Sequence, residues 1–204
     1  MFMKDINKKY WDKYYNKKLI PEIPSQFSAF VASELMFVYK IQKIVEFGSG
    51  NFRDSNFFAK NNFNIVAVDP SGKLEQKKSL KIKFCKTGFE KFFDEVFKVS
   101  KTPICFYGRF FLHAISKENQ VLFFKILRDK IKKNDIVALE FRIDKDKKLK
   151  KETAKHYRGF ISTNYFENTL LKKEFKILYK VSGTGFAKYK SDNAYIARYL
   201  IKIK

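Results

Sequence analysis

This chain of 204 residues contains few cysteines and no long hydrophobic run. Its two cysteines, Cys85 and Cys105, are too few for a metal framework, and no His/Cys cluster has zinc spacing. We expect two buried thiols in a reducing compartment. The longest apolar runs are far shorter than a membrane span, and residues 1–5 hold no stretch long enough for a signal peptide. A cytoplasmic protein with no membrane span and no metal is therefore the default expectation.

Arginine is scarce although the chain is strongly basic. Lys and Arg number 43 against 21 Asp and Glu, a formal net charge of +22, yet arginine occurs only at Arg53, Arg109, Arg128, Arg142, Arg158 and Arg198. A field of this sign attracts nucleic acid, acidic lipid or small anions. Bases and phosphates are usually bound by arginine forks, however. A lysine-, asparagine-, isoleucine- and phenylalanine-rich composition is also typical of an AT-rich genome, so both explanations of the charge stay open.

Apolar side chains are abundant enough for one folded domain. Hydrophobic residues make up 45% of the chain and aromatic residues 18%, which excludes a disordered chain. Short apolar runs alternate with helical patterns. Strands are predicted at 43–47, 64–69, 81–84, 103–107 and 136–141, and helices at 54–60, near 73, at 88–97 and at 116–132. This alternation predicts an α/β fold with a mostly parallel sheet.

The two ends of the chain have other patterns. Helices are predicted at 4–18 and, with Ser25 as N-cap, up to residue 38. A charged connection at 144–155 is expected to be exposed and mobile. A helix at 166–171 and strands at 175–181 and 195–203 then predict an antiparallel pair at the sheet edge. The clearest amphipathic helix, 116–132, is expected to place on its apolar side Val121, Phe124, Ile126 and Leu127.

The most informative stretch joins strand 43–47 to the next helix. Glu46 precedes the turn Gly48-Ser49-Gly50-Asn51, and Asp69 ends the following strand. Glycines allow a tight strand-to-helix turn and let a ligand approach the backbone, and an acid at the tip of the second strand can accept hydrogen bonds from a ribose diol. A plain structural turn is the alternative. The flanking strands and the acid favour a nucleoside-type cofactor.

A third glycine, which dinucleotide-binding turns contain, is missing from this stretch. Phe52, Arg53 and Asp54 follow Asn51 instead. Glu46 would repel a pyrophosphate, but its carboxylate can pair with a cation. The turn therefore favours S-adenosylmethionine, with its sulfonium and amino group, over NAD.

The segments 46–55 and 68–71 together resemble the cofactor motif of class I S-adenosylmethionine-dependent methyltransferases. The chain is also similar to small bacterial methyltransferases of capsule or surface-polysaccharide and related small-molecule biosynthesis, through segments 10–15, 24–27, 107–115, 140–142, 156–158 and 185–189. The resemblance implies a Rossmann-like seven-stranded sheet of order 3-2-1-4-5-7-6 with helices on both faces. It implies a single domain, 1–204, with an N-terminal helical lid (1–40), a cofactor-binding core (41–142) and an acceptor-side part (143–204).

The resemblance further implies a binding site for S-adenosyl-L-methionine. Its members would be Trp11, Tyr15, Ser25, Phe27, Glu46, Gly48, Ser49, Gly50, Asn51, Asp69, Pro70, Ser71 and Tyr107. Glu46 and the turn would take the methionine half, and Asp69 the ribose hydroxyls. The aromatic helix around Trp11 would close over the cofactor, although plain aromatic packing is the alternative. Phe52 departs from the family's usual glycine, and its side chain is expected near the cofactor's amino-acid end.

Candidate acceptor residues lie beyond the fourth and fifth strands. Substrate binding is predicted for Arg109, His113, His156, Arg158 and Lys188, with His113 or His156 as a catalytic base if the acceptor is a hydroxyl. A core or capping role is the alternative for His113. The chain has no Asn-Pro-Pro-Tyr and no Pro-Cys dipeptide, which speaks against methylation of exocyclic amines on nucleobases and against a covalent cytosine-C5 mechanism.

Together these patterns predict methyl transfer to an oxygen of a small, anionic acceptor. A capsule or surface-glycan precursor, or a phosphate or phosphoramidate group, is the acceptor that the resemblance suggests. Two alternatives stay open: the charge favours an RNA methyltransferase, and Phe52 favours a binding module that has lost catalysis.

Overall fold

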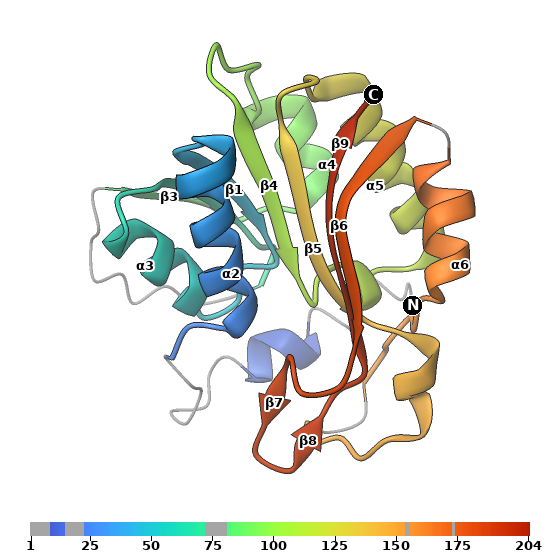
Figure 1. Ribbon diagram of the computed structural model, residues 1–204. Coiled ribbons are helices and arrows are strands. Elements are labelled where there is room, and N and C mark those ends of the chain that lie inside the picture. The colour runs from blue at the N-terminus through green and yellow to red at the C-terminus, as the bar shows by residue number, and fades with distance from the viewer. Residues whose placement is uncertain (1–8, 15–22, 72–80, 154–155, 173) are drawn as a thin grey trace.

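The computed structural model describes residues 9–14, 23–71, 81–153, 156–172 and 174–204. They contain a seven-stranded sheet of order β3-β2-β1-β4-β5-β9-β6 (Figure 1). The parallel strands are β1 (Lys43–Phe47), β2 (Asn64–Val68), β3 (Ile82–Cys85), β4 (Ile104–Arg109) and β5 (Ile136–Arg142). Strand β9 (Ile196–Ile203) runs antiparallel between β5 and β6 (Phe175–Gly183). Strands β7 (Lys188–Tyr189) and β8 (Asp192–Asn193) belong to a separate small sheet, so β9 is the seventh strand of the main sheet along the chain. The predicted order 3-2-1-4-5-7-6 is therefore confirmed.

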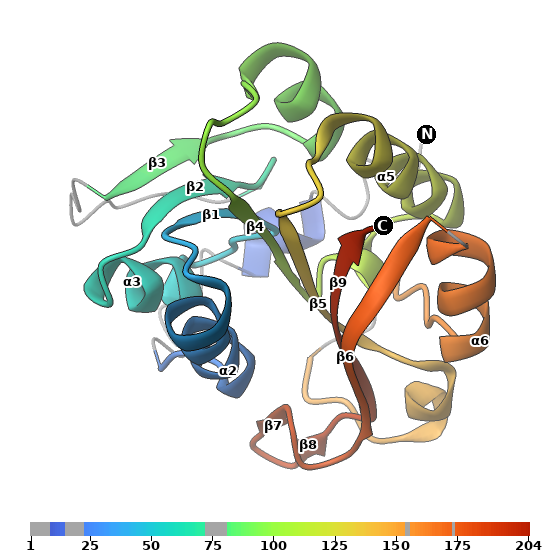
Figure 2. The ribbon, with the colours of Figure 1, turned by 45° about the horizontal axis from the view of Figure 1, so that its top comes forward.

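Helices cover both faces of the sheet, as predicted (Figures 1 and 2). One face carries α2 (Gln26–Glu34), which continues as a π-helical turn over Leu35–Tyr39, and α3 (Arg53–Lys60). The other face carries α4 (Phe89–Lys91) with the π-helical Phe92–Val96, α5 (Lys117–Lys130), and α6 (Thr163–Tyr165) with the π-helical Phe166–Leu171. The fold is therefore a three-layer α/β sandwich.

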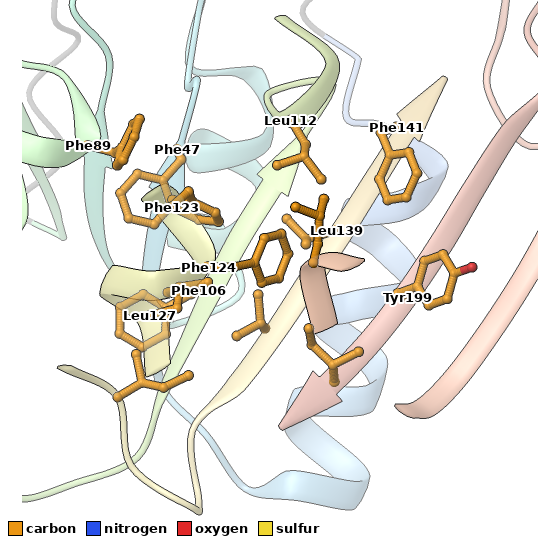
Figure 3. Packing of buried hydrophobic residues seen from close by; sticks show 14 of the residues in the cluster. Phe47, Phe89, Phe106, Leu112, Phe123, Phe124, Leu127, Leu139, Phe141 and Tyr199 are labelled. Atoms are coloured by element: carbon orange, nitrogen blue, oxygen red, sulfur yellow. The ribbon is translucent and has the colours of Figure 1, made fainter. Parts of the chain in front are cut away.

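Alternating strand residues supply two separate hydrophobic cores. In β4, Phe106 packs into the core under α4 and α5, whereas Cys105 and Tyr107 pack into the core under α2 and α3. Strand β5 is buried along its whole length because it is covered on both faces. Phenylalanine rings dominate the first of these cores, where Phe47 and Phe123 meet edge to face at 5.2 Å (Figure 3). Both predicted thiols, Cys85 and Cys105, are buried.

Helix α5 corrects one prediction about its buried face. Val121 was expected on the apolar side, but it is 50% exposed, and Gln120 is buried instead. Gln120 lies on the same stripe as Phe123, Phe124 and Leu127, which are separated by three or four residues along the helix. Its amide donates to the carbonyl oxygen of Leu112 at 3.1 Å, so a polar residue takes a core position.

The charged connection after β5 also differs from its prediction. Most of its side chains are exposed, but Asp146 in the 3-10 turn Asp144–Lys148 is fully buried. Its carboxylate lies 2.7 Å from Arg142 and 3.2 Å from Lys151. A buried carboxylate needs such cations because burial alone disfavours its charge. The charge pattern of the sequence therefore did not predict this buried ion pair.

Two short elements frame the carboxyl ends of the parallel strands. Residues 9–14 are helical, within the helix predicted at 4–18, and the rest of that helix lies outside the described residues, as does the helix predicted near residue 73. The hairpin of β7 (Lys188–Tyr189) and β8 (Asp192–Asn193) was not predicted. Two-residue strands are too short for an alternating pattern. In Figure 1 the helical segment 9–14 and this hairpin lie together below the sheet.

Candidate functional site

A cavity of about 820 Å³ opens at the carboxyl ends of β1, β2, β4 and β5. Parallel strands bring these ends to one edge of the sheet, where ligands of open α/β folds bind. Its walls come from seven parts of the chain: the helical segment 9–14, the turn after β1, the end of β2, the segment 87–91 at the start of α4, the end of β4 with the segment that follows it, the end of β5 with the segment that follows it, and the β7–β8 hairpin. We expected Gly48, Asp69, Tyr107 and Phe141 to face one crevice; Gly48 and Asp69 line this cavity, whereas Tyr107 and Phe141 are buried and do not.

The turn between β1 and α3 forms one wall. Gly48 and Gly50 have φ angles of +72° and +55°, which disfavour other residues. A Cβ atom at Gly48 would lie only 3.3 Å from the Cβ of Phe111, so this position has little space for a side chain. The N–H of Gly50 donates to Asp69 Oδ2 at 2.9 Å. The glycines therefore let the turn reach the acid at the end of β2.

Asp69 is a buried acid that keeps acceptor capacity. Its Oδ1 accepts the N–H of Ser71 at 2.8 Å, so each carboxylate oxygen has one backbone donor and a further lone pair. Burial raises the pKa of Asp69 to about 6, although the backbone hydrogen bonds oppose this shift. Nearby, Ser49 Oγ is buried without a hydrogen-bond partner among the described residues. Both side chains line the cavity and can receive polar groups of a ligand.

Glu46 lines the same half of the cavity but is not a free carboxylate. Burial and the neighbouring Asp54 raise the pKa of Glu46 well above its ordinary value. Ser55 donates its hydroxyl to Glu46 Oε2. The ligand-free site thus favours the protonated acid, and a bound cation would favour its ionised form.

Asp54 explains where three predicted cofactor residues lie. Its carboxylate accepts hydrogen bonds from the backbone N–H of Ser25 and from the Tyr107 hydroxyl, both at 2.8 Å. Phe27 stacks on Tyr107 with ring centroids 5.2 Å apart. These three side chains are buried beneath the cavity and do not line it. Tyr15 was also predicted to bind the cofactor, but it lies outside the described residues.

Phe52 does not point toward the cavity, contrary to expectation. Its φ of +61° at the N-cap of α3 is a conformation that glycine adopts freely, whereas it costs a residue with a side chain about 1–2 kcal/mol. The ring is only 4% exposed and meets Phe84 edge to face at 5.0 Å. Phe52 therefore changes the backbone energetics of the turn but leaves the cavity open.

The cavity concentrates the scarce arginines. Arg53, Arg109, Arg142 and Arg158 line the cavity, although they are four of only six arginines in the chain. Arg109 is held by the buried Glu140, with Nε 2.9 Å from Oε1. The guanidinium also lies 4.3 Å from the ring centroid of Phe110, a cavity residue with a φ of +58°. Arg142 lies 5.4 Å from the same ring centroid, and residues with such strained backbone cluster at functional sites.

Arg142 connects three segments around the acceptor half. Its Nη1 lies 2.7 Å from Asp146 Oδ2, and its Nη2 lies 2.6 Å from Asp192 Oδ2 on the β7–β8 hairpin. The backbone N–H of Arg142 donates to His113 Nδ1 at 3.2 Å. Neutral His113 consequently carries its proton on Nε2.

This arrangement disfavours His113 as a base. Burial lowers the pKa of His113 well below its ordinary value, and the cationic Arg142 lowers it further. Because Nδ1 already accepts a hydrogen bond, the ring offers an Nε2–H donor toward its surroundings. His113 lines the cavity as a neutral donor.

His156 joins the acceptor side to the helical segment 9–14. Its ring stacks on Tyr10 at 4.2 Å and meets Trp11 edge to face at 5.0 Å. The same segment is tied to the hairpin, because Tyr14 forms a side-chain hydrogen bond with Tyr189. Trp11 and Tyr14 line the cavity, so this aromatic cluster covers it from the N-terminal side.

The predicted acceptor residues therefore come together. Arg109, His113, His156, Arg158 and Lys188 all line the cavity. So do the predicted cofactor residues Trp11, Glu46, Gly48, Ser49, Gly50, Asn51, Asp69, Pro70 and Ser71. Sequence reasoning missed Arg53, Arg142, Tyr157 and Asp192. The scarcity of arginine was the one signal that pointed to the first two.

Neither a metal centre nor a membrane-spanning helix appears in the parts of the chain that the structure describes. No group of three or more His, Cys, Asp or Glu side chains is placed to hold an ion within these ranges. Among the same residues, no helix combines the length and the hydropathy that a bilayer crossing needs.

The fold, but no sequence family, is found among known proteins. No family model matches the chain, and no curated protein matches it. A SAM-dependent methyltransferase from Anabaena variabilis has 16% identity and a TM-score of 0.66 over 97% of this chain and 95% of its own. The 1,6-didemethyltoxoflavin-N1-methyltransferase of Burkholderia thailandensis, solved with its substrate and S-adenosylhomocysteine, has 13% identity and a TM-score of 0.68 over 99% and 87%. The [4+2]-cyclase SpnF has 9% identity and a TM-score of 0.66 over 87% and 80%.

Proposed function

We propose that this chain is an S-adenosylmethionine-dependent methyltransferase that methylates an oxygen of a small, anionic acceptor. The observation that carries the proposal is one cavity with two chemically different halves. The turn Gly48–Gly50 and Asp69 form a half suited to an adenosyl amino acid, and arginines form the other half. Structures of the same fold support the choice of cofactor, although that fold also occurs in a cyclase and so does not fix the reaction.

The residues present fit this cofactor. Asp69 keeps lone pairs for the two ribose hydroxyls, and Ser49 Oγ is a buried polar atom without a partner among the described residues. Gly48 and Gly50, whose positive φ angles favour glycine, present backbone to the cavity where the amino-acid part of a ligand would lie. Glu46 can compensate the positive charge of the methionine part. When bound, the cofactor supplies an electrophilic methyl group on a sulfonium.

The acceptor half supplies binding and alignment. Arg109, Arg158 and Lys188 are placed to attract an anionic oxygen, and His113 can donate a hydrogen bond from Nε2. Alignment of two bound reactants can supply most of the acceleration of such a transfer. An acceptor oxygen that is already ionised needs no base, which agrees with the neutral, donor form of His113. The aromatic cluster of Trp11, Tyr14 and His156 excludes water from the reacting groups.

The acceptor class rests on this cationic wall and on the resemblance in sequence. Precursors of capsule or surface glycans, including phosphate and phosphoramidate groups, carry the anionic oxygens that such a wall would bind. We assign the chain to that class of acceptor.

A transfer assay tests the proposal. The protein is incubated with S-adenosylmethionine labelled on its methyl group and with a panel of small sugar phosphates, carboxylates, neutral sugars and RNA. We expect label in an anionic product and a rate that falls when Arg158 is changed to Met. The matched control is Arg128→Met, an arginine outside the cavity. Label transferred only to neutral compounds or to RNA would contradict the assignment, and cofactor binding without any turnover would indicate a binding module.

A further inference from the structure

Asp192 lies at a position that the proposed transfer does not explain. It is the first residue of β8, on the hairpin whose Tyr189 forms a hydrogen bond with Tyr14 of the helical segment 9–14. The side chain lines the cavity, yet the residue is only 2% exposed. A carboxylate beside a wall that attracts anions opposes the binding of an anion. Its presence there calls for a physical reason.

Arg142 donates a hydrogen bond to one carboxylate oxygen of Asp192, and the other oxygen has no donor among the described residues. Oδ2 accepts from Arg142 Nη2 at 2.6 Å. Oδ1 is shielded from solvent and has no hydrogen-bond partner among the described residues. A carboxylate oxygen can accept about two hydrogen bonds, and a buried acceptor without any loses the solvation that water gave it. Such an atom in a cavity wall indicates a missing donor.

The Asp192 side chain is held in place, so a donor for Oδ1 must be brought to it by a ligand. Its partner Arg142 is fixed from the other side by the fully buried Asp146, at 2.7 Å. Rotation of the Asp192 carboxylate would break a buried ion pair, which is costly. Asp192 is thus a preorganised residue of the cavity wall, and Oδ1 is its unsatisfied acceptor.

We propose that Asp192 determines acceptor specificity by accepting a hydrogen bond from the acceptor, which is therefore a small anion that also carries a hydroxyl or ammonium group. The anionic part lies against Arg158 and Lys188, and the donor group lies against Asp192 Oδ1. This inference rests on the proposed function and names the substrate class of the same cavity. Asp192 acts here in recognition and takes no part in proton transfer.

Three matched anions test this recognition. Glycerol 3-phosphate offers hydroxyls, O-phosphoethanolamine offers an ammonium, and propyl phosphate offers neither donor. Their affinities are measured by calorimetry, with and without S-adenosylhomocysteine. We expect at least one donor-bearing anion to bind about tenfold or more tightly than propyl phosphate, which is the range of a hydrogen bond to a charged group. The stronger of the two identifies the donor as hydroxyl or ammonium.

Asp192→Asn links this preference to one side chain. The amide keeps an oxygen for Arg142 but removes the carboxylate charge. We expect the preference to fall to within about twofold, while propyl phosphate binds as well as before or better. Asp94→Asn, an exposed aspartate on the π-helical Phe92–Val96, is the matched control and should keep the preference. If Asp192→Asn does not fold, equal affinity of the unaltered protein for the three anions still overturns the inference.

The outcomes separate this inference from the proposed function. Equal affinity for the three anions, no measurable affinity for any at millimolar concentration, or a preference that survives Asp192→Asn overturns the role of Asp192 in recognition. None of these results concerns the cofactor. Failure to bind S-adenosylhomocysteine overturns the proposed function instead, whichever anion is preferred.

Discussion

The two halves of the cavity are built in different ways. The cofactor half comes from the turn after β1 and the end of β2, and its main contact joins Gly50 to Asp69 over nineteen residues. The acceptor half depends on pairs between remote segments, such as Arg142 with Asp192 and Arg198 with Glu140, which are 50 and 58 residues apart. The first half uses backbone groups and acids, and the second uses buried ion pairs. Mutations should therefore disturb ligand affinity in the first and folding in the second.

The largest effect is expected from Arg142→Met. It leaves Asp146 and Asp192 buried without their main cation, and breaking a buried pair in this way typically costs about 3–5 kcal/mol of unfolding free energy. Urea unfolding followed by circular dichroism measures the loss. Arg128→Met, which breaks an exposed pair with Glu174, is the control and should change stability far less. Equal losses in the two variants would remove the distinction between the halves.

The next effect is a pH dependence of the cofactor half. The pKa of Asp69, about 6, lies above its ordinary value of 3.8, so the ligand-free protein loses stability from this group as the pH rises through 6. Ribose hydroxyls bind the ionised form, so affinity for S-adenosylhomocysteine should rise over the same range. Between pH 5 and 7 the gain should be about tenfold. Asp69→Asn should flatten this profile, and an unchanged profile in that variant would assign the titration to another group.

Glu46→Gln is expected to raise the stability of the protein, by less than Arg142→Met lowers it. Burial raises the pKa of Glu46, which means that ionisation of this acid destabilises the ligand-free protein as the pH rises. The amide avoids that cost and can still accept from Ser55. We expect the melting temperature at pH 8 to rise by about 2–4 °C, the shift that 1 kcal/mol gives a domain of this size. Affinity for S-adenosylmethionine should fall, and a variant that loses stability without losing affinity would show that Glu46 is structural.

The smallest effect on ligand affinity is expected from Phe52→Leu. The ring packs against Phe84 and away from the cavity, so its loss should lower stability by about 1 kcal/mol. Affinity for S-adenosylhomocysteine should stay within about twofold of the original. A larger loss, measured by calorimetry, would place the Phe52 side chain at the cofactor.

The sequence predicted the parallel core well because its signals are local. Strands β1, β2, β4 and β5 are short apolar runs with turns on either side, and the glycine turn with Asp69 lies within 25 residues. The antiparallel pairing of β6 and β9 was also predicted from their apolar patterns, whereas the order of the sheet followed from the resemblance. Alternation and turn chemistry act over a few residues, which is the distance that a pattern in the sequence covers.

The acceptor half could not be predicted in the same way. Asp146 was one acid in a run of charges, and only the fold shows that it is buried against Arg142. Asp192 belongs to strands of two residues, below the length at which alternation is visible. Ser25 and Tyr107 were assigned to the cofactor, but their shared partner Asp54 holds them in the layer beneath the cavity. Pairing between remote residues determined these positions.

Calorimetry with S-adenosylhomocysteine tests the central claim most directly. We predict one molecule bound per chain, and affinity about 10- to 100-fold weaker in Asp69→Ala, which removes charge-assisted hydrogen bonds to the ribose. Asp94→Asn should bind as the original does. If the unaltered protein shows no binding, or if Asp69→Ala binds as tightly as the original, the cavity is not a site for this cofactor and the account fails.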